Sequence, residues 1–494
     1  MYKVKMHVSP AFTVGQTDPK IFGSFIEHIG RAVYGGVYEP AHPSADEYGF
    51  RNDVSELIKE MNVPIIRYPG GNFVSGYNWE DGIGPRESRP RRADLAWKTT
   101  ETNQCGTDDF SAYCERIGSE VLMTVNLGTA GASEAKNLVE YCNLPEGTYY
   151  SDLRRKNGRE KPYGIKYWCL GNEMDGEWQI GHKEAHEYGR LAHETSKMMK
   201  QVDPSIQTVL CGSSSPDMRT FGEWEREVLK VAYDSVDMIS LHRYYSNRSL
   251  DTPEFVACPL DAEKFINDVI AFCDAEKAVR RSKKTIMLSF DEWNVWNHTN
   301  DVPVKEWSVA PPILEESYTV EDALLVGGFL ITLLRHCDRV RIACLAQLVN
   351  VIAPIMTKNG GGAWRQTTFY PFADCSNNGR GTVYDVRIDT PSYRTRFGEA
   401  GYTDGVAVTN DRGETVIFAV NRSLDEEAEF TCDLNGIADG NTAVHTFLTG
   451  DPKACNSMEN PRNVKPETAA DPELRDGRLA AVLPPFSWNM ITIR

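Results

Sequence analysis

Several features that would assign this 494-residue chain to a common protein class are missing from its sequence. No apolar run approaches the ~20 residues that a helix needs to span a bilayer. No Cys-x-x-Cys pair is present, which removes a frequent zinc and thiol-redox motif. Gly360–Gly362 is not followed by Gly-Lys-Ser/Thr, and Ser213–Ser215 is not part of a Gly-x-Ser-x-Gly turn. These absences argue against a membrane span, a phosphate-binding loop and a serine hydrolase.

Positive charge is also scarce. The 53 Lys and Arg residues are outnumbered by 70 Asp and Glu residues, which gives a formal net charge of −17. Such acidity argues against nucleic acid or an anionic membrane surface as the main partner. It suits a neutral substrate, so we expect neither nucleic-acid nor membrane binding.

Twelve cysteines are scattered along the chain, and several, such as Cys169, Cys211 and Cys344, lie inside apolar runs. Buried, reduced thiols of a cytoplasmic protein are the simplest interpretation. Residues Met1–Val8 alternate in polarity like a strand and contain no apolar stretch of the kind that a signal peptide needs. We therefore expect a cytoplasmic location.

Apolar, β-branched runs alternate with stretches of helical periodicity over most of the chain. The eight candidate strands are Ile21–Ile29, Val63–Tyr68, Val121–Asn126, Ile165–Asn172, Thr208–Cys211, Val236–His242, Thr285–Asp291 and Arg341–Val349. The amphipathic stretches between them include Val54–Met61, Phe110–Ile117, Glu184–Gln201, Ala262–Val279 and Val320–Cys337. This alternation predicts an α/β fold of the (β/α)8 TIM-barrel type. A doubly wound open sheet is the alternative, weakened by the absence of Gly-x-Gly-x-x-Gly after the first strand.

The sequence pattern changes at about Thr382. Short β-like runs then follow one another between Gly, Asn and Asp turns, with no helical stretch among them, which predicts a β-sandwich. These runs are Val406–Val408, Thr415–Val420, Glu427–Cys432, Thr442–Phe447 and Trp488–Ile493. We predict three parts: an N-terminal strand within residues 1–15 that pairs into the sandwich, a catalytic barrel over 16–381, and the C-terminal β-sandwich over 382–494.

Two apolar runs, Trp168–Glu173 and Leu288–Trp293, each lead into a glutamate. Glu173 and Glu292 are 119 residues apart, close to three strand–helix units of roughly 40 residues each. Two carboxylates at one barrel mouth can cleave a glycosidic bond, one as general acid/base and the other as nucleophile. Taken singly, Glu173 could belong to a helix cap and Glu292 to an ion pair. We expect Trp293 to form a platform for a sugar.

Other predicted strands also end in polar residues, as suits recognition of a ligand with many hydroxyl groups. These residues are Glu27, His28, Arg67, Asn72, His242, Tyr244 and Gln347. Each taken alone is more often structural. A long excursion, Pro69–Gly106, follows the second strand and would leave the barrel at the face where active sites lie.

Metal and cofactor motifs are weak. His182 and His186 are spaced to share a helix face, but they do not form His-Glu-x-x-His and no third ligand is evident. A solvated helix is the better interpretation. We expect no metal ion, nucleotide or other cofactor.

Taken together, the motifs resemble the family-51 glycoside hydrolases, retaining α-L-arabinofuranosidases of the (β/α)8 clan A. The resemblance spans nearly the whole chain and is carried by Ile21–His28, Arg67–Phe73, Tyr77–Pro85, Trp168–Gly176, Phe290–Asn294, Gln347–Ile355 and Leu483–Asn489.

The resemblance implies a role for each matching position. Glu173 would be the general acid/base and Glu292 the nucleophile. The arabinofuranosyl ring would be bound by Glu27, Asn72, Asn172 and Gln347. Tyr244 would hydrogen-bond the nucleophile, with Arg67 and His242 in support. A homohexamer is also implied.

The hypothesis is therefore exo-acting, retaining hydrolysis of terminal α-L-arabinofuranosyl groups from arabinan, arabinoxylan or their oligosaccharides. Glu173 would hold a proton at the start of the reaction and Glu292 would not. Two alternatives stay open: a clan relative that acts on xylosides or glucans, and a non-catalytic carbohydrate-binding protein. The sequence does not indicate the natural polymer, the preferred linkage or the leaving-group preference.

Overall fold

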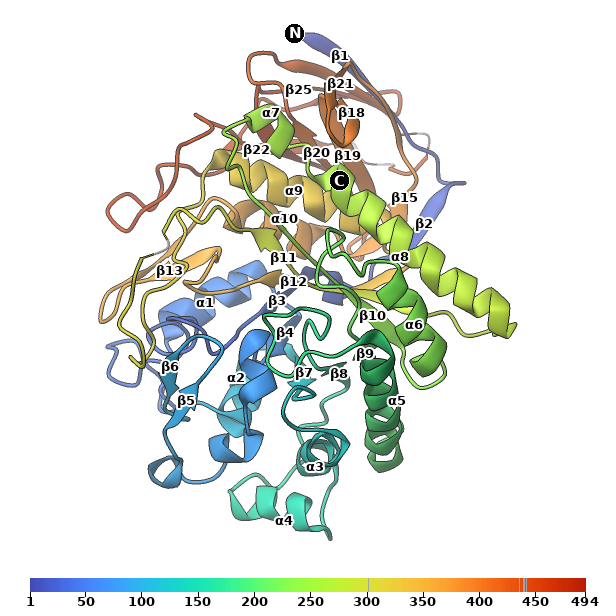
Figure 1. Ribbon diagram of the computed structural model, residues 1–494. Helices are drawn as coiled ribbons and strands as arrows, with labels where there is room; N and C mark the ends of the chain where they lie inside the picture. The colour runs from blue at the N-terminus through green and yellow to red at the C-terminus, as the bar shows by residue number, and fades with distance from the viewer. Residues whose placement is uncertain (301, 435, 439, 441) are drawn as a thin grey trace.

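The computed structural model describes every residue except 301, 435, 439 and 441. Its centre is a closed barrel of eight parallel strands (Figure 1). In barrel order the strands are β3 (Gly23–Phe25), β4 (Ile65–Tyr68), β7 (Glu120–Val125), β8 (Tyr167–Leu170), β9 (Gln207–Leu210), β10 (Met238–Tyr245), β11 (Met287–Val295) and β12 (Val340–Ala346). Because β12 pairs with β3, the ring closes. The predicted TIM barrel is confirmed and the open-sheet alternative is wrong.

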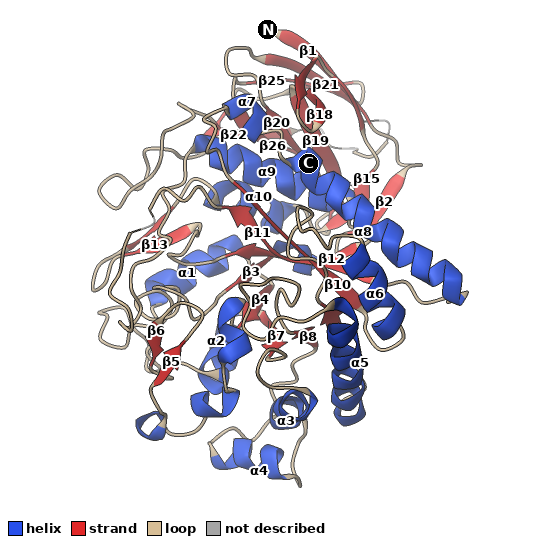
Figure 2. Ribbon diagram, viewed as in Figure 1, coloured by secondary structure: helices blue, strands red, loops and turns tan. Residues whose placement is uncertain are grey.

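Helices surround the barrel strands, except that the short α7 (Thr252–Phe255) lies beside the β-strands that follow the barrel (Figure 2). They are α1 (Asn52–Met61), α2 (Thr107–Ile117), α3 (Ala132–Asn143), α4 (Tyr149–Lys156), α5 (Ala185–Val202), α6 (Glu223–Ala232), α7 (Thr252–Phe255), α8 (Pro259–Arg280), α9 (Val320–Arg335) and α10 (Phe369–Asn378). α2 ends at Gly118, whose φ of 79° is the left-handed conformation that glycine adopts at little steric cost.

The part of the chain after the barrel, together with residues 2–16 from before it, folds mainly into two β-sheets. One has the order β16-β1-β21-β25-β24 and the other β2-β15-β19-β20-β26-β22-β23. Their strands are β1 (Tyr2–His7), β2 (Thr13–Gln16), β15 (Gly381–Tyr384), β16 (Arg387–Asp389), β19 (Thr403–Asn410), β20 (Thr415–Asn421), β21 (Ala428–Asp433), β22 (Ala443–Leu448), β23 (Glu467–Thr468), β24 (Glu473–Arg475), β25 (Arg478–Leu483) and β26 (Ser487–Ile493). β1 pairs with β21 in parallel and with β16 in antiparallel fashion. The domain boundaries after residues 15 and 381 stay a prediction.

Helix α9 joins the barrel to this β-domain. Residues Val320–Leu334 are all buried, as expected for a helix that is apolar all round. α9 contacts β11 on one side and β19, β20 and β26 on the other. Trp488 approaches it so closely that a Cβ atom on Gly327 would lie 2.4 Å from the indole. The barrel and the β-domain are therefore packed against each other with α9 buried between them.

The long excursion after β4 is more ordered than its sequence indicated. It contains the 3-10 helices η2 (Asn72–Gly76), η3 (Trp79–Gly82) and η4 (Arg86–Ser88) and a hairpin of β5 (Arg92–Asp94) and β6 (Thr99–Glu101). The Asp94 carboxylate shapes the hairpin tip, because it accepts hydrogen bonds from the backbone N–H groups of Ala96 (3.0 Å) and Trp97 (3.1 Å). The remaining short elements are η1 (Pro19–Phe22), β13 (Ile355–Thr357), β14 (Ala363–Arg365), β17 (Ser392–Thr395) and β18 (Gly398–Gly401).

All twelve cysteines lie in the described part of the chain and all are free. Eleven are buried, in agreement with the predicted buried thiols, and Cys455 is half-buried. Among the described residues, no helix has both the length and the apolar character that a membrane crossing requires.

Candidate active site

The two glutamates singled out in the sequence meet at the carboxyl ends of the barrel strands. Glu173 lies three residues beyond β8, whereas Glu292 lies within β11 rather than at its end. The strand-end prediction is thus wrong for Glu292, because β10 and β11 continue past the apolar runs that mark their cores. One oxygen of Glu173, one oxygen of Glu292 and one nitrogen of His242 all lie within 4.8 Å of one another.

A β-bulge in β11 sets the direction of its polar side chains. Ser240 pairs with Ser289 but His242 pairs with Glu292, so β11 has one more residue than β10 between these pairs. A bulge interrupts the alternation of side chains. Asp291 and Glu292, although adjacent in sequence, therefore both contact the buried guanidinium of Arg67.

The expectation for Trp293 is wrong for the same geometric reason. Trp293 is 1% exposed and faces away from the barrel mouth. Its indole stacks on Phe329 of α9, with ring centroids 4.2 Å apart and planes within 2°. Trp293 thus belongs to the core between β11 and α9 and forms no sugar platform.

Two donors hold the Glu292 carboxylate. Arg67 Nη1 donates to Oε2 at 2.7 Å, and the Tyr244 hydroxyl donates to Oε1 at 2.7 Å. Arg67 also donates through Nη2 to Oδ1 of Asn172 at 2.6 Å. Burial, followed by the nearby Glu292 carboxylate, raises the pKa of Tyr244 well above its usual value. Tyr244 therefore stays protonated and remains a donor.

Glu173 also accepts two hydrogen bonds. His242 Nδ1 lies 2.9 Å from Oε1, and the Trp178 indole N–H donates to Oε2 at 2.8 Å. Burial lowers the pKa of His242, but the carboxylates of Glu292, Asp291 and Glu173 outweigh it and raise this pKa to about 10. A protonated imidazole has no lone pair for a metal ion, so the cluster suits proton transfer better than metal binding.

Glu27 lies on another side of the same pocket, two residues beyond β3. Its Oε1 accepts hydrogen bonds from the backbone N–H of Phe73 and from the Trp97 indole, both at 2.9 Å. Gln347 Nε2 lies 3.3 Å from its Oε2. Burial and then the charge of Glu292 raise the pKa of Glu27 to about 7, although the donors oppose this shift. Asn172 Nδ2 lies 3.5 Å from Oδ1 of Asn72.

The sequence-predicted residues thus surround one pocket of about 460 Å³. Glu27, Asn72, Glu173, Tyr244, Glu292 and Gln347 line it directly. Asn172, Arg67 and His242 lie behind the lining residues and form hydrogen bonds with Asn72, Glu292 and Glu173 respectively. His28 instead turns away to bond Glu101 and Tyr68, each at 2.8 Å, in a buried cluster.

Three tryptophans in the pocket wall were missed by the sequence analysis: Trp97, Trp178 and Trp296. They come from the β5–β6 hairpin, the loop after β8 and the loop after β11. Their loop positions beyond barrel strands were the available signal, but only the fold shows which tryptophans face inward.

The two histidines considered as metal ligands do not share a helix face. His182 lies in a turn before α5, whereas His186 lies within α5 and pairs with Glu227 at 2.7 Å. Their spacing had suggested one continuous helix, but α5 begins at Ala185.

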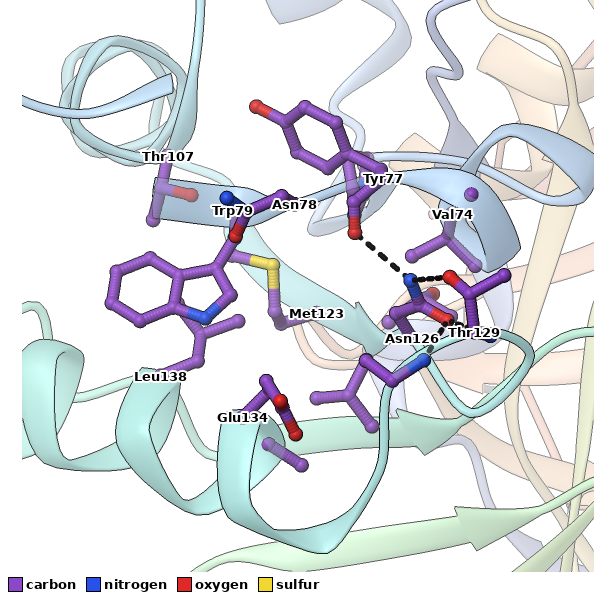
Figure 3. Close-up of a pocket in the computed structure, with 16 residues that line it drawn as sticks. Val74, Tyr77, Asn78, Trp79, Thr107, Met123, Asn126, Thr129, Glu134 and Leu138 are labelled. Atoms are coloured by element: carbon purple, nitrogen blue, oxygen red, sulfur yellow. Dashed lines mark hydrogen bonds between the residues drawn. The ribbon is translucent and has the colours of Figure 1, made fainter. Parts of the chain in front are cut away.

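A second pocket, of about 220 Å³, lies between β7, α3 and the 3-10 helices η2 and η3 (Figure 3). Asn126 braces its wall, because its Nδ2 donates to the Tyr77 carbonyl at 2.9 Å and to the Thr129 hydroxyl at 3.0 Å. Among its described lining residues Glu134 is the single carboxylate, so the pocket lacks the paired acids that glycoside cleavage needs.

Comparison with known proteins agrees with this geometry. Residues 57–257 match the family model described as α-L-arabinofuranosidase 1 domain, and residues 291–487 match the model described as α-L-arabinofuranosidase C-terminal domain. The chain is 55% identical to an intracellular exo-α-(1→5)-L-arabinofuranosidase 1 of Bacillus subtilis, over 100% of this chain and 99% of that protein. The chain belongs to the family 51 α-L-arabinofuranosidases.

Two further comparisons support the assignment. A solved family 51 α-L-arabinofuranosidase from Bifidobacterium longum superposes with a TM-score of 0.96 at 43% identity, covering 100% of both chains. An exo-α-(1→6)-L-arabinofuranosidase of Bifidobacterium longum is 47% identical over 99% of this chain and 97% of that protein. The names of similar relatives thus differ in linkage.

Proposed function

We propose that the pocket removes terminal α-L-arabinofuranosyl groups by a retaining double displacement, with Glu292 as nucleophile and Glu173 as general acid/base. The observation that carries this proposal is the separation of at most 4.8 Å between an oxygen of Glu173 and an oxygen of Glu292. Retaining glycosidases place their carboxyl groups ~5–5.5 Å apart, whereas inverting enzymes need ~6.5–9.5 Å to admit a water molecule.

In the first step, Glu173 donates its proton to the glycosidic oxygen as the bond from that oxygen to the anomeric carbon breaks. Glu292 attacks the anomeric carbon and forms a glycosyl–enzyme ester. Arg67 and Tyr244 hold Glu292 in line through bonds of 2.7 Å each.

In the second step, Glu173 acts as a base and takes a proton from water. The water oxygen attacks the anomeric carbon and the bond to Glu292 breaks, which releases arabinose with its original configuration. His242 Nδ1, 2.9 Å from Oε1 of Glu173, holds the carboxylate in the orientation that both steps require.

The sugar ring is bound by the polar side chains around the pocket. Glu27, Asn72, Asn172 and Gln347 offer carboxylate and amide groups to its hydroxyls. Asn172, fixed by Arg67 at 2.6 Å, is placed to bond the hydroxyl beside the reacting carbon.

For the natural substrate we propose α-1,5-linked arabino-oligosaccharides, cleaved inside the cell, because relatives at 52–55% identity carry that linkage and location in their names. Turnover of matched 1,5-, 1,3- and 1,6-linked disaccharides tests the linkage. We also propose that the protein forms a homo-oligomer, and the family resemblance implies a hexamer. Light scattering measures this oligomeric state directly.

The roles of the glutamates are tested with Glu292→Ala and Glu173→Ala, using Glu177→Ala as control because Glu177 is exposed in the same loop as Glu173. Glu292→Ala abolishes turnover of nitrophenyl α-L-arabinofuranoside, and azide restores part of it as a glycosyl azide. Full activity of the Glu292→Ala variant would exclude Glu292 as the nucleophile. Preferred turnover of the xyloside or glucoside favours a clan relative. Sugar binding without release of arabinose favours a lectin.

A further inference from the structure

The indole of Trp178 is both exposed and bonded to the proposed acid/base. Its N–H donates to Oε2 of Glu173 at 2.8 Å, yet Trp178 is 54% exposed. The other oxygen of Glu173 accepts from His242, which is 2% exposed and therefore fixed. The two bonds to Glu173 thus differ: one donor is locked in the barrel and the other can leave.

The two chemical steps require opposite protonation states of Glu173. The first needs its protonated form and the second its carboxylate. A hydrogen-bond donor at Oε2 favours the carboxylate. Because His242 occupies Oε1, the leaving-group oxygen must approach Oε2, where Trp178 now lies.

We propose that Trp178 is a displaceable positioning residue: it holds Glu173 as a carboxylate while the leaving-group side of the pocket is empty, and the incoming glycosidic oxygen displaces it. Glu173 then takes up a proton from solvent water, and it donates this proton in the first step. After the leaving group departs, the indole returns and supports the carboxylate that activates water. This inference rests on the proposed function of Glu173.

The loop geometry allows the ring to move without the backbone. Gln179, the next residue, is 2% exposed, and its Nε2 donates to Ser75 Oγ at 2.5 Å. The backbone N–H of Gly176 donates to the Glu173 carbonyl at 2.9 Å. The backbone is therefore fixed on both sides of Trp178, and rotation of an exposed side chain is fast.

Gly176 offers a second, independent way to disturb the contact. A Cβ atom at Gly176 would lie 2.5 Å from two ring atoms of Trp178, so the indole must shift. Gly176→Ala therefore moves the ring but keeps the N–H, whereas Trp178→Phe keeps an aromatic ring but removes the N–H.

The charged groups near Glu173 remain unchanged in both variants. They are His242 on β10, Asp291 and Glu292 on β11, Arg67 on β4, and Asp175 in its own loop. A change in the pH profile is then assigned to the indole. Trp307→Phe is the matched control, since Trp307 is a 47% exposed tryptophan that does not line the pocket.

The test is the pH dependence of kcat/KM for α-1,5-arabinobiose, whose leaving group requires the acid, together with kcat for the nitrophenyl arabinofuranoside. Trp178→Phe and Gly176→Ala move the alkaline limb to higher pH by about half a unit to one unit, since loss of the donor favours protonated Glu173. Where the second step limits kcat, the nitrophenyl kcat falls about three- to tenfold. Trp307→Phe matches wild type.

An alkaline limb that stays in place in Trp178→Phe overturns the inference, and a thermal unfolding scan of each variant separates this result from misfolding. If Gly176→Ala does not fold, Trp178→Phe decides alone. Failure of the proposed function looks different, because then wild type itself releases no arabinose from either substrate.

Discussion

The Tyr244 hydroxyl donates a 2.7 Å hydrogen bond to Oε1 of Glu292, from the neighbouring strand of the barrel. Arg67 bonds the other oxygen of the same carboxylate. A carboxylate with both oxygens engaged cannot rotate freely, so the direction of its free lone pairs is set by the two strands. The nucleophile is thus aimed by its neighbours as well as by its own backbone.

Tyr244→Phe removes one of these restraints. We expect kcat/KM for nitrophenyl α-L-arabinofuranoside to fall about 10- to 100-fold, since a hydrogen bond to a charged group contributes roughly 1.5–3 kcal/mol. Tyr149→Phe, at a tyrosine that is 73% exposed, is the control and leaves kcat/KM unchanged. Wild-type kinetics in Tyr244→Phe would exclude its role in aiming Glu292.

His242 makes stability depend on pH. Its pKa in the folded protein is about 10, because Glu292, Asp291 and Glu173 outweigh its burial, whereas its ordinary value is 6.5. The stabilisation is fully present below pH 6.5 and is lost as pH rises through 10. We expect the free energy of unfolding of wild type to fall across this window more steeply than that of His242→Gln. Parallel urea-unfolding curves for the two proteins from pH 6 to 10 would contradict this.

Glu27 has a linkage of the same sign as His242, but in a lower pH window. Burial and the charge of Glu292 raise its pKa to about 7 from 4.5, so its contribution to stability is present below pH 4.5 and is lost as pH rises through 7. We predict that Glu27→Gln is at least as stable as wild type at pH 8 but binds L-arabinose about tenfold more weakly, as expected for loss of a charged hydrogen-bond acceptor. The unfolding free energy and the arabinose inhibition constant measure the two effects. Unchanged inhibition would remove Glu27 from the sugar site.

Substitution of Trp293 should lower stability, whereas substitution of Trp296 should weaken substrate binding. Trp293→Ala removes a buried indole that stacks on Phe329 and should cost about 3–5 kcal/mol of unfolding free energy. Trp296→Ala, in the pocket wall, should raise KM several-fold with a much smaller loss of stability. The reverse pattern would restore Trp293 as the sugar platform.

The barrel could be predicted because most of its strands are apolar runs between helical stretches, although the first run, Ile21–Ile29, forms only the three-residue strand β3. The two glutamates stood out since a carboxylate that ends such a run is costly unless it has a use. What the sequence could not show was register. One extra residue in β11 turns Asp291 and Glu292 to the same side and sends Trp293 to the core, and no local pattern encodes that bulge.

The tryptophans of the pocket were beyond prediction for a different reason. Trp97 reaches Glu27 from a hairpin tip that is 70 residues further along the chain. Trp178 reaches Glu173 through a series of turns that follow no repeating pattern. Contacts of this kind depend on how loops fold over the barrel mouth. Hydrophobic periodicity in the sequence does not determine this.

The most direct test of the account is an NMR time course of nitrophenyl α-L-arabinofuranoside hydrolysis, recorded before the released sugar can mutarotate. The separation of at most 4.8 Å between oxygens of Glu173 and Glu292 predicts that α-L-arabinofuranose appears first and the β-anomer only later. First appearance of the β-anomer would mean a single displacement by water and would contradict the assignment of Glu292 as nucleophile.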